Sequence, residues 1–348
     1  MRLTRRQLNR TLLHRQRLLR RTPGDVHETA HHLIGLQAQE NLPPYFALAA
    51  RLDDFDPHTV TRGLEDRSLV RLVVMRGTIH LLTADDALML RQWTQPCQER
   101  ERRSSQNVKA ALHLDTAEVN AAISDALHDG PLPMKALGEA MATRFPDVPP
   151  AALGHLARVN QPLAQVPPRG AWKQSGGVVL QYVDRWLDRP LVAPDPPEIV
   201  RRYLRAFGPA SAADVGAWSG LTRLAAVLKE MDDLVEHEDE NGKKLFDVPD
   251  GELADAETPA PVRLLGTYDN VWLSHAGRDR VTDPEKRSQW MGANGGVAMS
   301  MFVDGWLEGL WRIDDGRPTV VSVLRKLTRA QQAELDEEFD RVTDLLAR

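Results

Sequence analysis

Apolar and polar positions follow two different periods along this chain. In some stretches apolar residues recur every three or four positions, which predicts amphipathic helices, and in others they recur every second position, which predicts strands. One order recurs, in which short helices are followed by a pair of strands. Because this is the order of elements in a winged helix, the pattern predicts several winged-helix units in tandem.

Three such units are predicted before residue 259. Their helices span 4–20, 26–38, 44–52, 57–66, 134–145, 151–159, 197–206, 212–218 and 222–231. Their strands span 69–75, 78–82, 178–183, 234–237 and 244–248. Gly77 marks the turn of the first strand pair, and Asn241-Gly242, a strong hairpin signal, marks the turn of the last pair.

After residue 258 the pattern changes to short strands at regular spacing, which predicts a small β-barrel-like unit. These strands span 262–265, 270–273, 297–303, 306–313 and 319–324, and an amphipathic helix opened by Thr328 spans 329–346. The predicted fold class is therefore α+β: three tandem winged-helix units, each a helix-turn-helix with a β-hairpin, followed by a β-barrel-like C-terminal unit, C-shaped overall. The predicted domains are 1–115, 116–190, 191–258 and 259–348.

The charge of the chain is unevenly distributed. The net charge of −5 argues against a nucleic-acid binder, because such domains are usually basic. However, residues 1–21 carry eight arginines and no acid, whereas residues 232–257 carry eleven acids against Lys243 and Lys244. This asymmetry predicts either one basic face or a solvated, amphipathic first helix.

The single cysteine, Cys97, excludes an intrachain disulfide and fits a reducing compartment, where we interpret it as structural. No stretch of eighteen uncharged apolar residues occurs, and the N-terminus lacks the features of a secretory signal. We therefore expect a cytoplasmic protein that does not enter a membrane.

The sequence His27-Glu28-Thr29-Ala30-His31 has the H-E-x-x-H spacing of zinc peptidases. On a helix, His27 and His31 share a face, and Glu28 would act as the general base. A third protein ligand is not identifiable at a suitable distance, so we favour a helix with half-exposed histidines and expect no metal.

Gln37-Ala38-Gln39 lies where the helix predicted over 26–38 ends, just before Pro43 and Pro44. Two residues apart on a helix, the amides would point in nearly opposite directions, so they converge only if the backbone leaves helical geometry. Gln37 lies four residues after Leu33 on the inward side, where an amide needs hydrogen-bonding partners. Taken alone, the pair is typical of a solvated helix end.

Five segments carry a further signal: residues 36–40 (Leu-Gln-Ala-Gln-Glu), 45–52, 71–81, 268–275 and 303–311. Together they resemble the winged-helix DNA-binding family that contains the AlkX and AlkZ DNA glycosylases. The Gln-x-Gln form resembles the AlkZ branch, which includes azinomycin self-resistance glycosylases. The resemblance implies three tandem winged helices with a β-barrel, and excision of bulky N7-alkylguanine adducts with unhooking of interstrand crosslinks, for self-resistance to a DNA-alkylating natural product.

The resemblance also implies that Gln37 and Gln39 are the catalytic residues. Glutamine does not titrate, but a guanine alkylated at N7 is already a cation and leaves without an acid. Two amide carbonyls are then sufficient to position a water molecule beside C1′ and to stabilise the developing oxocarbenium. Neither a metal nor another cofactor is needed for this monofunctional reaction.

The expected partner is double-stranded DNA carrying alkylated or crosslinked purines, bound by a monomer. The residues predicted to contact it lie in the two wings and in the Gly-rich turn 293–296; they are Arg71, Arg76, His80, Arg169, Trp172, Lys173 and Asn294. The alternative for His80 and Trp172 is that they pack inside the protein. The alternative for the glycines of 293–296 is that they only form a tight turn.

A non-catalytic, winged-helix transcriptional regulator is the rival hypothesis, because winged helices serve recognition more often than catalysis. A regulator would bind undamaged duplex at a preferred sequence, whereas a glycosylase would bind with little sequence preference and release a modified base.

Overall fold

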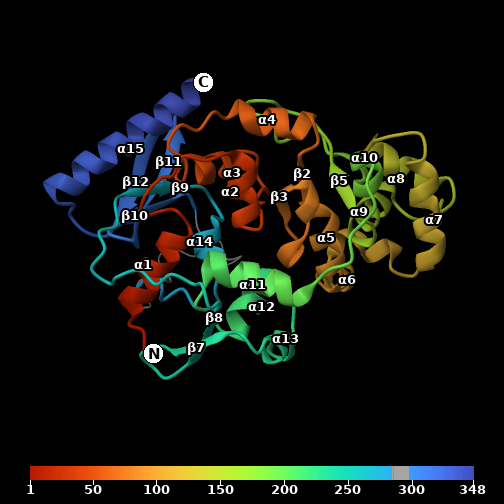
Figure 1. Cartoon of the computed structure of the whole chain (residues 1–348). Helices are drawn as coiled ribbons and strands as arrows, with labels where there is room; N and C mark the ends of the chain where they lie inside the picture. Colours follow the sequence, from red (N-terminus) through yellow and green to blue (C-terminus); the bar gives the residue numbers. More distant parts are fainter. Residues whose placement is uncertain (284, 286–297) are drawn as a thin grey trace.

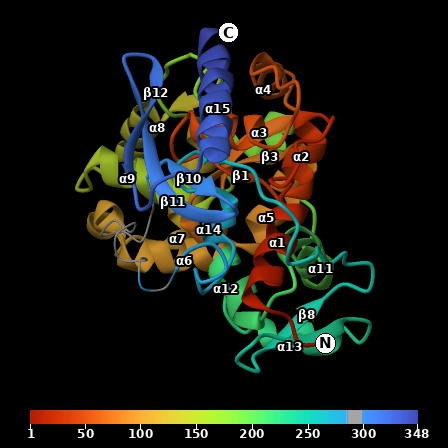
Figure 2. The same cartoon turned by 90° about the vertical axis from the view of Figure 1, so that its left-hand side faces the viewer.

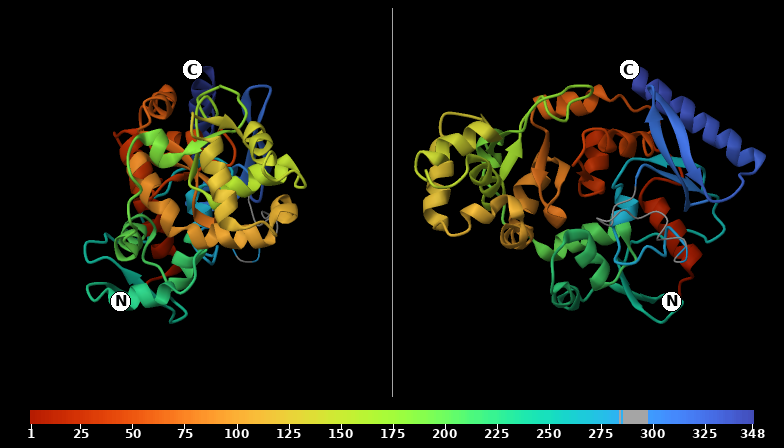
Figure 3. Two further views of the ribbon diagram at one scale, coloured as in Figure 1. Left: turned by 90° about the vertical axis from the view of Figure 1, so that its right-hand side faces the viewer. Right: turned by 180° about the vertical axis from the view of Figure 1, so that it is seen from behind.

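The computed structural model describes residues 1–283, 285 and 298–348. Helices and antiparallel strands are interleaved along the chain, which confirms the predicted mixed class (Figure 1). Helices α7–α9 lie at one end of the molecule, and helix α15 with the sheet β9–β12 lies at the other (Figures 1 and 3). Helices α11–α13 and the hairpin β7–β8 lie along a third side, next to the N-terminus (Figure 1).

The elements have the following bounds in the described residues. The α-helices are α1 (Arg5–Arg15), α2 (Val26–His32), α3 (Pro43–Ala49), α4 (His58–Glu65), α5 (Ala84–Trp93), α6 (Gln95–Ser104), α7 (Thr116–Ala126), α8 (Met134–Ala142), α9 (Pro150–Asn160), α10 (Val183–Leu187), α11 (Pro196–Phe207), α12 (Ala212–Ser219), α13 (Leu224–Glu230), α14 (Asn270–Leu273) and α15 (Arg329–Ala347), with 3-10 turns η1 (Met75–Gly77) and η2 (Gln106–Ala111). The strands are β1 (Leu36–Gln37), β2 (Leu69–Val73), β3 (Ile79–Thr83), β4 (Leu132–Pro133), β5 (Leu163–Gln165), β6 (Val179–Tyr182), β7 (Val235–Glu238), β8 (Lys244–Asp247), β9 (Arg263–Leu265), β10 (Ser300–Val303), β11 (Trp306–Asp314) and β12 (Arg317–Val323).

A six-stranded sheet with the order β1-β3-β2-β5-β6-β4 lies at the centre of the fold. The hairpin β2–β3 is joined to β5 through the pairs Arg71↔Gln165 and Leu72↔Ala164. The strands of the first two predicted units therefore form one continuous sheet. Because β1 and β3 lie at one end of this sheet, the Gln37 segment is fixed to a large, shared scaffold.

The C-terminal strands form an open antiparallel sheet with the order β12-β11-β10-β9, and no barrel closes among the described strands. Helix α15 packs on this sheet (Figure 2), because its buried Leu335, Val342 and Leu345 belong to the same apolar cluster as Met301 and Trp311. The side chain of Thr328 caps α15 by accepting a hydrogen bond from the Gln331 backbone, as the sequence predicted.

The predicted strand 270–273 is wrong, because this stretch is helix α14. The Asp269 side chain accepts a hydrogen bond from the Val271 backbone N–H and so begins the helix. Apolar residues this close together fit either a short strand or a buried helical turn, and the packing of Val271 and Trp272 into the main core decides between them.

The helix predicted over 26–38 ends early, at His32. Ile34 and Gly35 adopt left-handed backbone angles, with φ values of 54° and 88°. The Gly35 N–H donates to the Ala30 carbonyl over 2.8 Å, a helix-ending bond that glycine allows without steric cost. The chain then enters β1, so Gln37 lies on a strand and not at a helix end.

Several arginines near the N-terminus are paired with acids of the same chain. Arg15 forms a buried ion pair with Asp247 over 2.7 Å, which joins the basic first helix to the acidic stretch 232–257. Arg10 pairs with Asp304 and Arg21 pairs with Glu338. Much of the charge asymmetry in the sequence is therefore used in ion pairs within the protein. Arg10, Arg15 and Arg21 are not part of a free basic face. In the ranges that the structure describes, no helix is both long and apolar enough to cross a membrane.

We expect Gly35→Ala to destabilise the protein more than Gly242→Ala. Both positions have left-handed backbone, so an added Cβ costs about 1 kcal/mol of unfolding free energy at either. At Gly35 the Cβ would also lie 2.4 Å from Leu82 Cδ2, whereas at Gly242 nothing lies within 4 Å. Denaturant titration should give Gly35→Ala a further loss of about 1–3 kcal/mol. Equal losses in the two variants would contradict the proposed close contact.

Candidate active site

Gln37 ends strand β1, and Gln39 follows two residues later, where the chain bends. Gln37 pairs with His80 in the antiparallel ladder of β1 and β3, and the Ala38 N–H donates to the Ile79 carbonyl over 2.7 Å. Gln37 is buried, with 7% of its surface exposed, and Ala38 is fully buried, whereas Gln39 is exposed. Because the helix ends at His32, before both residues, the divergence that a helix would impose on the two amides does not arise.

Each amide is oriented by a neighbour that can only donate. Gln37 Oε1 accepts a hydrogen bond from Arg76 Nη2 over 2.9 Å, and Gln39 Oε1 accepts one from the Ile79 N–H over 2.8 Å. Guanidinium and backbone N–H groups offer no lone pair, so the oxygen of each amide must face them. Both carbonyl oxygens keep a second lone pair for a further hydrogen bond.

His80 lies directly behind this pair and is almost fully buried. Burial, reinforced by the neighbouring charge of Arg76, lowers the pKa of His80 to about 3, so its ring is neutral at physiological pH. Its Nδ1 lies 3.0 Å from the Thr78 carbonyl and must carry the proton, which leaves Nε2 as the acceptor 3.4 Å from Arg76 Nη2.

A segment far along the chain supports the turn before Gln37. Asn270 Nδ2 donates to the Gly35 carbonyl over 2.8 Å. The adjacent Asp269 forms a buried, bidentate ion pair with Arg51, with its shorter N–O distance at 2.7 Å. These supporting roles were missed in the sequence, because no spacing rule connects residues more than two hundred positions apart; only the resemblance over 268–275 marked the segment.

Three of the residues predicted to contact DNA are buried, so that prediction is corrected for them. Arg71 is 1% exposed, and its Nη2 donates to the carbonyl of Ala38 over 2.9 Å. His80 is 1% exposed beside Arg76, and Trp172 packs with its ring centroid 4.7 Å from that of Tyr45. Arg71 is a basic residue that supports the Gln37–Gln39 segment from inside, since it satisfies the buried Ala38 carbonyl.

The other candidates for DNA contact are distributed differently. Lys173 is exposed and Arg169 is half-buried, with Arg169 Nη1 donating to the Gly176 carbonyl over 3.0 Å. Arg76 is half-buried between Gln37 and the Trp218 carbonyl. Asn294 and the turn 293–296 lie outside the described residues. Lys173 and Arg169 are therefore the remaining surface candidates of the second wing.

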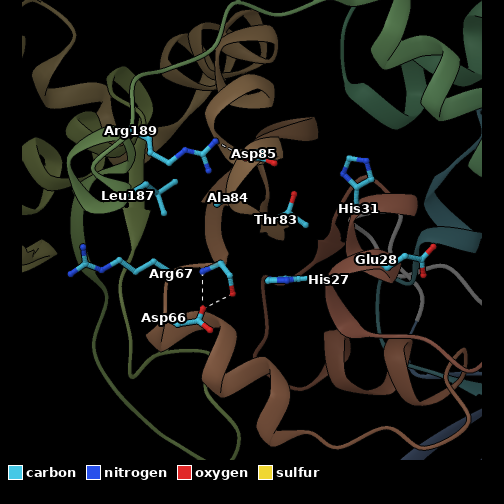
Figure 4. A pocket seen from close by; sticks show the side chains of 11 residues that line it. His27, Glu28, His31, Asp66, Arg67, Thr83, Ala84, Asp85, Leu187 and Arg189 are labelled. Carbon is cyan, nitrogen blue, oxygen red and sulfur yellow. Dashed lines mark hydrogen bonds and ion pairs between the residues drawn. The ribbon is translucent and has the colours of Figure 1, made fainter.

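The H-E-x-x-H motif lines a separate cavity of about 680 Å³, which Figure 4 shows with His27 and His31 at its edge. Glu28 is turned away and forms an ion pair with Arg17, and His31 Nδ1 lies 3.2 Å from Asp86 Oδ2. Within the described ranges, no group of three or more His, Cys, Asp or Glu side chains is arranged to hold a metal ion. Neither Gln37 nor Gln39 lines this cavity.

The whole fold is similar to a solved structure, Streptomyces sahachiroi DNA glycosylase AlkZ, with a TM-score of 0.80 and 22% sequence identity over 100% of this chain and 98% of that chain. The family described as DNA glycosylase AlkZ-like matches residues 30–345, so the chain belongs to that family of DNA glycosylases. A curated relative, the interstrand DNA cross-link repair glycosylase of Streptomyces sahachiroi, is 27% identical over 326 residues, which cover 87% of this chain and 86% of the relative.

We expect the buried His80 to make the protein less stable in mild acid. Its folded pKa of about 3 lies below the unfolded value near 6.5, so the unfolded state binds more protons between those values. This contribution is complete above pH 6.5 and is lost as the pH falls toward 3, with a slope approaching about 1.4 kcal/mol per pH unit. Urea titrations between pH 5 and pH 7 should show a shallower dependence for His80→Gln than for the wild type.

The control for this measurement is His128→Gln, which replaces a histidine whose side chain is 81% exposed. The control should keep the wild-type dependence of stability on pH. A slope for His80→Gln that equals the wild-type slope would contradict the buried, neutral state of His80.

Proposed function

We propose that this chain hydrolyses the N-glycosidic bond of bulky N7-alkylguanine adducts in double-stranded DNA and unhooks interstrand crosslinks, with Gln37 and Gln39 as the catalytic residues. One observation carries this proposal. Two neutral amides lie two residues apart where the chain has left helical geometry, and each is oriented by a hydrogen bond to its carbonyl oxygen from Arg76 or from the Ile79 backbone. The name of the curated relative supports the crosslink as substrate.

The chemistry suits a substrate whose base already carries a positive charge. An N7-alkylated guanine departs as a neutral molecule when the glycosidic bond breaks, so no acid has to protonate it. The free lone pairs on Gln37 Oε1 and Gln39 Oε1 accept the two hydrogens of a water molecule, whose own lone pair then faces C1′. The same carbonyl dipoles stabilise the oxocarbenium that forms on the sugar.

The surroundings of the pair favour selectivity for such bases. His80 is neutral and buried, and Arg76 is occupied by acceptors of the protein, so neither is offered as a proton donor to a leaving base. An unmodified base, which needs protonation to depart, is therefore left in place. Neither a metal nor another cofactor takes part in the reaction as proposed.

The DNA is bound by the monomer, with Arg169 and Lys173 of the second wing as phosphate contacts. Such contacts give salt-sensitive binding with little sequence preference. The biological role we propose is self-resistance to a natural product that alkylates DNA.

Replacing either catalytic residue should slow the release of the modified base. Gln37→Ala and Gln39→Ala are each expected to lower the single-turnover rate of N7-alkylguanine release by ~100-fold or more, because each removes one of the two dipoles that position the water. Affinity for the same DNA should change little. Chromatography of released base and electrophoretic mobility shifts measure the two quantities separately.

Gln332→Ala is the matched control, since Gln332 is an exposed glutamine of α15 outside the proposed DNA contacts and should keep wild-type activity. Wild-type rates in both Gln37→Ala and Gln39→Ala would place catalysis elsewhere. A wild-type protein that releases no base from alkylated or crosslinked DNA, but binds one undamaged sequence tightly, would be a regulator and not a glycosylase.

A further inference from the structure

We infer that Arg76 is a positioning residue of this site, and that its guanidinium sets the orientation of the Gln37 amide and is not a DNA contact. The inference rests on the proposed function, because it assigns Arg76 a role in the same reaction. Its basis is a convergence of acceptors on one side chain: Gln37 Oε1, the Trp218 carbonyl and His80 Nε2.

The contacts of Arg76 require the geometry of a guanidinium. Arg76 Nη2 donates to Gln37 Oε1 over 2.9 Å and lies 3.4 Å from His80 Nε2, while Arg76 Nη1 donates to the Trp218 carbonyl. The acceptors come from β1, from β3 and from the C-terminal part of α12. A planar fork reaches such separate acceptors at once, whereas the single ammonium of lysine does not.

The backbone of Arg76 is held in an unusual conformation. Its φ of 55° and ψ of 15° place it in the left-handed region, within the turn η1 between β2 and β3. A non-glycine residue there costs about 1 kcal/mol or more, which the surrounding packing must offset. Gly220, just after α12, supplies that packing: a Cβ at this position would lie 2.9 Å from Arg76 Cα. The third unit therefore packs directly on the turn that orients Gln37.

The charge of Arg76 is not neutralised by an acid. Among the described residues no carboxylate forms an ion pair with it, and its hydrogen-bonding partners are neutral. Burial lowers the pKa of Arg76 to about 10, so the group stays cationic at neutral pH. A carboxylate would compete with the amide for the guanidinium. Without one, Gln37 Oε1 receives a charge-assisted hydrogen bond, which is stronger and more directional than one from a neutral donor.

A double-mutant cycle tests whether Arg76 acts through Gln37. In the wild-type background, Arg76→Lys should lower the single-turnover rate of base release by ~10–100-fold, because a misplaced water costs that much. In the Gln37→Ala background, the same substitution should cause almost no further loss, because the amide that Arg76 orients is gone. If the rate losses of Arg76→Lys and Gln37→Ala multiply in the double variant, the inference is wrong.

The salt dependence of binding separates this role from a phosphate contact. If Arg76 neutralised a phosphate, Arg76→Ala would weaken binding and reduce the slope of log K against log salt by about 1. We expect the slope and affinity to stay at wild-type values. A reduced slope would reassign Arg76 to the DNA interface.

Chemical rescue keeps the inference testable if the variants are less stable. Guanidinium ion at non-denaturing concentration should restore part of the activity of Arg76→Ala, since it can occupy the space between Gln37 and Trp218; a thermal melt checks that the variant is folded. Arg100→Lys is the matched control, because Arg100 donates to the nearby Gly220 carbonyl and makes no contact with Gln37. It should keep the wild-type rate.

The outcomes distinguish the two proposals. If the wild-type protein releases no base, the proposed function itself is wrong. If the wild type is active and Gln37→Ala is slow but measurable, an Arg76→Lys loss that is as large in the Gln37→Ala background as in the wild type, together with no rescue, contradicts only the role of Arg76.

Discussion

The two-residue pairing of β1 with β3 is the interaction on which the site depends. It places Gln37 opposite His80, and it leaves the Ile79 N–H directed at the Gln39 side chain. So short a strand does not persist alone, because two residues gain too few hydrogen bonds to offset their loss of conformational entropy. It persists because the left-handed turn at Gly35 delivers the chain to the edge of a six-stranded sheet.

Positive charge in this protein is used largely to join distant parts of the chain. Arg15 connects the first helix to Asp247, Arg51 connects the first unit to Asp269, and Arg71 bonds the Ala38 carbonyl. A buried guanidinium is costly unless acceptors surround it, so each of these contacts strongly disfavours any other arrangement of the joined segments. Counting arginines therefore overstates the surface that is available to DNA.

The environment of Gln37 combines a neutral amide and a neutral imidazole ring with one guanidinium cation. Arg76 donates a hydrogen bond to the carbonyl oxygen of Gln37, and Nε2 of the neutral His80 ring accepts one from the same guanidinium. The reaction proposed above, in which the leaving group is already activated, needs dipoles of fixed direction and no proton donor. Under that proposal, discrimination between bases depends on the reactivity of the base as much as on its shape.

The sequence by itself determined the elements that depend on neighbouring residues. The helices near 58–65, 134–142, 150–160 and 196–207 follow from apolar periodicity, and the turn at Asn241-Gly242 follows from local backbone preference. The Gln-x-Gln pair was selected through resemblance over the whole chain. Tertiary structure decided which side of the chain each of these residues faces, and which basic residues are buried. Burial and hydrogen-bonding partners come from segments distant in sequence, as Asn270 does for the Gly35 carbonyl, and no local pattern contains that information.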